Sequence, residues 1–274
     1  MEPAVRSAFG KTRISYESKP GYVPMIRLYI EINYRARISL FERETEGGEF
    51  CEPGDVVQGS LGDCYFLGAL ATASTHEDVL LDMFPDLPSN LVNHGSSSEG
   101  PANEQEFNDE GVYAIKFYRD GKWRIVVVDD YLPCDKDGNL CFCKPGPGGA
   151  ELWAILAEKA YAKLAGSFEA IIGGQESTAL RDITKGMPMR LKISTTNPSS
   201  CGPRFKGPKG DDELWRELND HQTEEEIDLM GCSTSLASAD AAGIITGHAY
   251  SLLETKIVRS GGGRSERLVK IRNP

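Results

Sequence analysis

A cysteine at the start of an apolar helix is the sequence feature that most limits what this chain can fold into. Residues 64–74 are crowded with apolar side chains and are predicted to be helical. Gly59 and Gly62 interrupt the chain directly before this stretch. The segment therefore predicts a turn followed by a helix, with Cys64 in the first helical turn.

This position favours the anionic form of the Cys64 thiol. A thiol is a weak nucleophile until it loses its proton, and the free N–H groups and dipole at a helix N-terminus stabilise the thiolate. The preceding glycines would let the backbone approach a substrate closely. Gln58 could donate its side-chain amide to the oxygen of a tetrahedral intermediate, beside the backbone N–H of Cys64. A glutamine before two glycines could also be simply exposed.

A cysteine nucleophile needs a base, and the base needs an orienting partner. The chain has four histidines, and His248 is the best candidate because it stands at the mouth of an apolar strand. Asn273 follows the strand-like residues 268–272, which could lie beside the strand of His248. Its side-chain carbonyl could then hold the ring N–H of His248. Taken singly, Cys64 could be a structural thiol, His248 a core histidine and Asn273 a turn residue.

Three motifs around these residues resemble those of the calpain family, cysteine peptidases with a papain-like arrangement. Residues 58–66 (QGSLGDCYF) are similar to the family's active-site signature, residues 247–251 (GHAYS) to its histidine motif and residues 272–274 (RNP) to its asparagine motif. Further blocks that agree are residues 127–133, 151–153, 158–164, 168–170 and 173–174. His248 lies further from Cys64 than the roughly 130–150 residues typical of papain, which favours the calpain branch.

The resemblance extends from about Asp55 to Pro274 and implies a fold and an activity. The fold is an α+β, papain-like two-lobed one, with a helix-rich first lobe and a strand-rich second lobe. The activity is that of a cysteine-type endopeptidase that performs limited cleavage of protein substrates. Cys64, His248 and Asn273 would be its catalytic triad, and no organic cofactor is implied.

The resemblance also implies control by calcium. Asp55 and Glu169 match carboxylates that bind calcium in the first lobe of calpains, and backbone carbonyls would complete the shell. A capping or surface role would suit these two carboxylates equally well. The calcium ligands of the second lobe lie after the asparagine motif in the family.

Two departures from the family keep alternatives open. Tyr65 stands where the family usually has Trp, and the chain stops at Pro274 where the family continues with Trp-Gly and more strands. The second lobe is therefore expected to be incomplete, with further domains in a full-length protein. The main alternative is a catalytically silent calpain-like module that binds or scaffolds partners. Transglutaminase-like acyl transfer is another, although such enzymes typically use Asp where this chain has Asn273.

The chain divides into three predicted parts. Residues 1–45 form an N-terminal segment of unknown role, residues 46–174 the lobe with the nucleophile, and residues 175–274 the incomplete lobe with His and Asn. Residues 26–41 suggest a strand or two. Residues 87–107, rich in Ser, Asn, Gly and Glu, predict an exposed inserted loop without an assigned function.

Local signals predict several further elements. Residues 112–118 and 123–128 are expected to be strands joined by a hairpin at Asp120-Gly121. Residues 151–164 give the clearest helical pattern, which Gly166 can close. The second lobe is predicted to contain a Gly- and Pro-rich stretch at 197–210, an acidic helix at 211–219 and strands at 249–258 and 268–272.

Composition excludes several classes of protein. The net charge of −11, from 30 basic and 41 acidic residues, argues against nucleic-acid binding, which depends on Lys and Arg. The sequence has no run of about 18 apolar residues, so it predicts no transmembrane segment. The polar N-terminus does not resemble a signal peptide. The odd count of seven cysteines, without a secretion signal, indicates reduced thiols and a cytoplasmic location.

Two metal motifs are rejected on spacing. Cys134, Cys141 and Cys143 lack the paired spacing of zinc sites and are expected to be ordinary thiols. Residues 135–139 resemble part of an EF-hand loop, but Pro133 and Lys144 would then occupy positions that need Asp and Glu. This segment is expected to be a turn.

Overall fold

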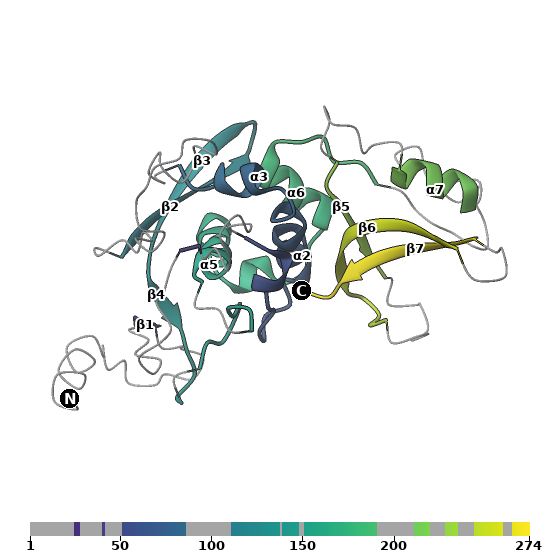
Figure 1. Cartoon of the computed structure of the whole chain (residues 1–274). Helices are drawn as coiled ribbons and strands as arrows, with labels where there is room; N and C mark the ends of the chain where they lie inside the picture. Colours follow the sequence, from purple (N-terminus) through teal and green to yellow (C-terminus); the bar gives the residue numbers. More distant parts are fainter. Residues whose placement is uncertain are drawn as a thin grey trace, which may run out of the picture.

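The fold is a mixture of helices and sheets in which a helical part adjoins a three-stranded C-terminal sheet (Figure 1). The computed structural model describes residues 25–27, 40–41, 51–85, 111–137, 139–147, 151–190, 211–219, 228–234, 244–259 and 265–274. Among them, no helix is long and apolar enough to cross a membrane. The predicted loops at 87–107 and 197–210, and most of the strand-like region 26–41, lie outside these residues.

The helical part contains four helices, a hairpin and shorter elements within the described residues. Its helices are α2 (Cys64–Ala73), α3 (Glu77–Leu81), α5 (Trp153–Ala165) and α6 (Glu176–Thr184), with 3-10 turns η1 (Pro53–Asp55) and η2 (Glu169–Ile171). Its strands are β2 (Val112–Arg119) and β3 (Lys122–Asp129), which pair with each other, and β4 (Tyr131–Pro133), which pairs with β1 (Met25–Arg27).

The C-terminal sheet has the strand order β5-β6-β7, and both pairs are antiparallel. The strands are β5 (Met230–Ser233), β6 (Ala249–Arg259) and β7 (Ser265–Arg272). Helix α7 (Asp211–Asn219) is tied to this sheet because Arg267 pairs with Asp212 and Thr255 donates to Asn219.

Helix α2 lies between α5 and the C-terminal sheet (Figure 1). Every residue of α2 after Cys64 is buried, as expected for a helix that is apolar on all sides. Gly68 has no side chain, so strand β6 can approach closely and Ser251 Oγ donates to the Gly68 carbonyl at 2.8 Å. The nucleophile candidate therefore begins the helix on which both parts of the protein pack.

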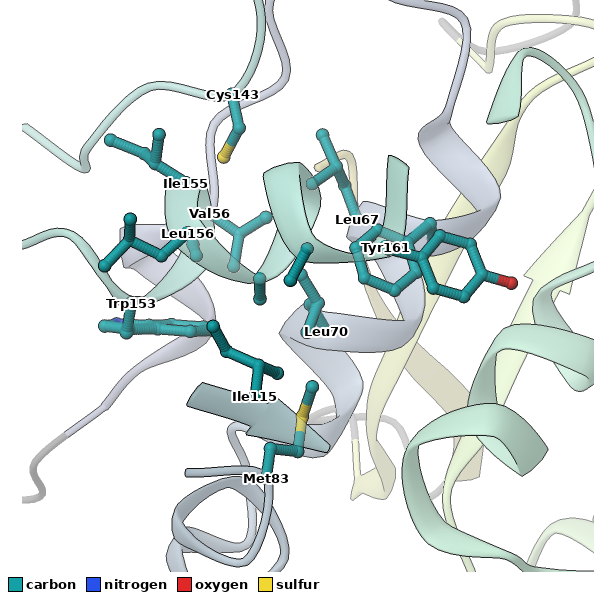
Figure 2. Packing of buried hydrophobic residues seen from close by; sticks show 14 of the residues in the cluster. Val56, Leu67, Leu70, Met83, Ile115, Cys143, Trp153, Ile155, Leu156 and Tyr161 are labelled. Atoms are coloured by element: carbon teal, nitrogen blue, oxygen red, sulfur yellow. The ribbon is translucent and has the colours of Figure 1, made fainter. Parts of the chain in front are cut away.

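The hydrophobic core gathers around α2 and α5 (Figure 2). Phe66 stacks on Tyr161 with ring centroids 4.0 Å apart, and Trp153 is fully buried. Each such side chain contributes roughly 1.5–3 kcal/mol by leaving water. Other core residues in Figure 2 are Val56, Leu67, Leu70, Met83, Ile115, Cys143, Ile155 and Leu156. The N-terminus of α2 is thus held in place by the packed core around α2 and α5.

Most predicted elements in the described residues are confirmed. The hairpin turns at Asp120 and Gly121, whose φ angles of 55° and 78° suit a tight two-residue loop. The helices at 64–74 and 211–219, and the strands at 249–258 and 268–272, appear as α2, α7, β6 and β7. The remaining predicted helix, residues 151–164, begins instead at Trp153, because Glu151 takes part in a β-bridge. Gly166, with φ of 111°, ends it as expected.

Two helices are additions to the predicted elements. Neither α3 nor α6 is predicted by the sequence patterns, since both are short and begin with charged residues. Helix α6 follows the predicted boundary at residue 174, and its Ala179 and Ile183 join the core around α2. The division into parts at 45 and 174 stays a prediction.

Candidate active site

Cys64 is the first residue of α2 and is partly exposed. Asp63 precedes it as the N-cap, but the Asp63 side chain makes no capping hydrogen bond. The Asp63 carbonyl accepts the N–H groups of Phe66 and Leu67 at 2.8 and 3.2 Å. The first N–H groups of a helix have no acceptor within the helix, so the N–H of Cys64 can stabilise an anion at this end of α2.

The loop before Cys64 is supported by residues 141–144. Val57 and Lys144 exchange backbone hydrogen bonds of 3.3 and 2.9 Å. Ser60 donates both its N–H and its hydroxyl to the Cys141 carbonyl, at 3.0 and 2.6 Å. The backbone of Gly59 packs directly on this segment, which explains why the position has no side chain.

Gln58 lies in this supported loop and is partly buried. Its Nε2 donates to the Leu61 carbonyl at 2.7 Å, which fixes the amide across the turn that leads to Cys64. An amide nitrogen carries two hydrogens, so a second donor remains after this bond. The predicted role of Gln58 at an oxyanion is compatible with this geometry and stays a prediction.

His248 and Asn273 lie together at the end of the C-terminal sheet. His248 immediately precedes β6, Asn273 immediately follows β7, and these strands pair up to Ser251 and Arg272. The distance between His248 Nε2 and Asn273 Oδ1 is 2.5 Å. A carbonyl oxygen can only accept, so Nε2 carries the proton and Nδ1 keeps its lone pair for a base.

Two side chains that the sequence argument missed hold the His248 turn. Thr234, which directly follows β5, accepts from the His248 N–H at 3.4 Å and donates its hydroxyl to the Ile245 carbonyl at 2.7 Å. The Tyr250 hydroxyl accepts from the Ile245 N–H at 2.8 Å, and its ring stands edge-on to the His248 ring. Tyr250 belongs to the histidine motif, but no sequence signal marked Thr234.

The structure joins the base to its orienting residue but does not join the base to the thiol. Within the described residues, Cys64 Sγ makes no hydrogen bond to His248 or to any other group. Catalytic hydrogen bonds are often long before a substrate is bound. The relative placement of Cys64 and His248 therefore depends on the contacts between the helical part and the C-terminal sheet.

A pair of buried carboxyls lies next to Cys64. Burial raises the pKa of Asp63 to about 6. Neither carboxylate oxygen of Asp63 has a hydrogen-bond partner among the described residues. Burial and the neighbouring Asp63 raise the pKa of Glu158 well above its usual range. Both Glu158 oxygens accept from the Cys143 N–H at 3.1 Å. The pair therefore retains a proton near neutral pH and supports the segment beneath the Gln58 loop.

Asp55 and Glu169, the predicted calcium ligands, lie on two 3-10 turns of the helical part. Asp55 Oδ2 accepts from the Glu52 N–H at 2.6 Å in a capping arrangement. Glu169 is exposed, and hydrogen bonds to its own backbone and to Ser167 lower its pKa. Carboxylate oxygens are suitable ligands for a hard cation. The part of the chain that the structure describes contains no cluster of three His, Cys, Asp or Glu side chains for a metal, so any calcium shell would rely on backbone carbonyls.

The described residues of the rejected EF-hand segment form a turn, as predicted. Asp135 Oδ1 accepts from the N–H groups of Asp137 and Asn139 at 2.8 and 2.9 Å. The Asp135 carboxylate is thus used to close its own loop.

The sequence is similar to one family of known proteins. The sequence profile described as calpain family cysteine protease matches residues 43–274. The chain is 36% identical over 223 residues to the calpain-type cysteine protease DEK1 of Zea mays, which covers 80% of this chain and 9% of that protein. It is 32% identical over 226 residues to the calpain-2 catalytic subunit of Mus musculus, which covers 80% of this chain and 27% of that protein. The chain therefore spans a small part of the length of these relatives.

Proposed function

Since the chain belongs to the calpain family of cysteine proteases, we propose that it carries the catalytic core of a cysteine endopeptidase with a papain-like, two-lobed arrangement. The hydrogen bond between His248 Nε2 and Asn273 Oδ1 is the observation that carries the proposal. It gives the imidazole the tautomer that a base needs. Cys64 at the N-terminus of α2 supplies the nucleophile.

The proposed reaction uses four side chains. The Cys64 thiolate attacks the peptide carbonyl, while the Cys64 N–H and the remaining donor of Gln58 stabilise the oxyanion. His248, protonated at Nδ1, gives that proton to the leaving amine, and the C–N bond breaks. His248 then takes a proton from water, which hydrolyses the thioester and releases Cys64. Asn273 keeps the imidazole ring in the same orientation throughout the reaction.

The proposal also includes a bound calcium ion and a reducing cellular location. Asp55 and Glu169 would hold a calcium ion, which would supply positive charge that fixes the two turns carrying them. A cytoplasmic location suits a thiolate nucleophile, and no disulfide joins the six cysteines that the structure describes. The substrates are proposed to be proteins cleaved at few sites.

Proteolysis by the full-length protein tests this function. With calcium, we expect an unfolded protein such as casein to be cut into large fragments. The Cys64→Ala variant should lose roughly a thousandfold or more in rate, because the nucleophile is gone. Cys232→Ala removes a partly buried thiol elsewhere and is the matched control.

Each outcome of this assay separates the proposals. Equal cleavage in the presence of a calcium chelator would retain the peptidase and remove calcium control. Transfer of an added amine to the product would indicate acyl transfer instead of hydrolysis. If the folded wild-type protein and Cys64→Ala are equally inactive, the binding or scaffold alternative replaces the enzyme.

A further inference from the structure

Arg272 joins the C-terminal sheet to the helical part at the candidate active site. Its Nη2 donates to the Val56 carbonyl at 2.7 Å and to the Gly54 carbonyl at 3.2 Å. These acceptors lie in and just after η1, more than 200 residues earlier in the chain. The guanidinium therefore connects backbone atoms of one part to the end of β7 in the other.

Both ends of this connection lie close in sequence to candidate catalytic residues. Arg272 directly precedes Asn273, which holds His248. On the other side, Val56 is fully buried in the core and lies close in sequence to Gln58. A displacement of Arg272 would thus move the His248–Asn273 pair relative to the loop that leads to Cys64.

Two other polar contacts between the described parts of the chain lie further from the site. Ser251 Oγ donates to Gly68, and Thr72 Oγ1 lies 3.4 Å from the Met230 carbonyl, both deeper along α2. These bonds fix β5 and β6 on the helix. The Arg272 bonds fix β7, the strand whose end carries Asn273. Arg272 is partly buried, and charged donors to carbonyl acceptors form stronger hydrogen bonds than neutral donors do.

We propose that Arg272 is a positioning residue that sets the distance between Cys64 and the His248–Asn273 pair by binding the Gly54 and Val56 carbonyls. This inference rests on the proposed peptidase function. Arg272 does not touch the reacting atoms. It acts through Asn273 on one side and through the Gln58 loop on the other.

The pH dependence of Cys64 alkylation by iodoacetamide tests the proposal in the full-length protein. A thiolate paired with an imidazolium reacts at mildly acidic pH, where an ordinary thiol is protonated. We expect Arg272→Gln to lower the alkylation rate on the acid side by about tenfold or more, the equivalent of one lost charged hydrogen bond. At alkaline pH the rates should converge. In proteolysis, kcat should fall while KM stays unchanged, and Arg272→Lys should restore part of both losses.

Arg267→Gln is the matched control, because it removes an exposed guanidinium from the same strand, where Arg267 pairs with Asp212. It should keep the wild-type profile. An Arg272→Gln protein that folds and keeps the wild-type acid-side reactivity would overturn the proposal. If Arg272→Gln does not fold, Arg272→Lys must fold and be alkylated more slowly than wild type on the acid side. Failure of both to fold would assign Arg272 a role in folding alone. If wild-type Cys64 reacts no faster than a free thiol, the proposed function itself fails.

Discussion

Gly59→Ala is expected to destabilise the protein by roughly 2–4 kcal/mol and to lower kcat/KM by about a hundredfold. A Cβ at this position would lie 1.9 Å from the Phe142 carbonyl oxygen and 2.8 Å from that of Cys141. These are backbone atoms, so the clash cannot be relieved by a side-chain rotation. The loop that carries Gln58 must shift instead. The measurements are urea unfolding and steady-state proteolysis.

Gly54→Ala is the matched control for this prediction. Gly54 lies in the same segment, and a Cβ added there meets no atom within 4 Å among the described residues. We expect its unfolding midpoint and kcat/KM to stay close to wild type. If Gly59→Ala is as stable and as active as Gly54→Ala, residues 141–144 do not support the loop in the way described above.

Glu176 gives the second large prediction, because its carboxyl is buried where the C-terminal sheet meets α2. Oε1 has no hydrogen-bond partner among the described residues. Gly68 and Gly231 face the carboxyl, and a Cβ on Gly231 would lie 1.9 Å from Oε1. Burial raises the pKa of Glu176 from 4.5 to about 8. Cys232 is the titratable neighbour on β5: burial and the Glu176 charge together raise the pKa of its thiol to about 11.

The protein is therefore expected to lose stability as pH rises from about 5 to about 8. The folded state keeps the Glu176 proton in this window, while the unfolded state has already released it. The contribution of this group is full below the unfolded pKa and is lost as pH rises to the folded pKa, at about 1.4 kcal/mol per pH unit. Glu176→Gln removes the proton equilibrium but keeps the shape of the group.

Urea unfolding of both proteins between pH 5 and pH 8 measures the effect. The free energy of unfolding of Glu176→Gln should fall less steeply than that of wild type, so the difference between them grows with pH. The other buried carboxyls, Asp63 and Glu158, are common to both proteins and cancel in the difference. Glu254→Gln, an exposed position on β6, should run parallel to wild type. Parallel curves for wild type and Glu176→Gln would contradict the prediction.

Local patterns predicted the parts of the fold whose signal lies within a few residues. The Asp120-Gly121 dipeptide, the glycine at 166 and the apolar run after Cys64 each specify backbone conformation directly. The contact between His248 and Asn273 was also anticipated, because both stand at strand ends that pairing brings together. Their catalytic roles stay predictions.

Contacts between distant segments were not predictable in the same way. The bond between Arg272 and Val56 depends on how β7 packs on the helical part, which no local pattern encodes. Glu176 in α6 is a hydrophilic residue at the start of a short helix, and only its tertiary position makes it a buried acid. The hydroxyl of Thr234 supports the His248 turn from the residue after β5, a separate segment of the chain. The roles of these residues depend on tertiary packing, so the periodicity of the sequence could not predict them.

Labelling of Cys64 by a thiol-directed epoxide tests the central claim most directly. The rates for wild type, Cys64→Ala and His248→Ala should be compared in the full-length protein, with calcium and with a chelator. We predict rapid labelling of wild type at Cys64, none at this site in Cys64→Ala, and much slower labelling in His248→Ala, because the base that stabilises the thiolate is lost. A folded wild-type protein whose Cys64 reacts no faster than a free cysteine under either condition would contradict the account.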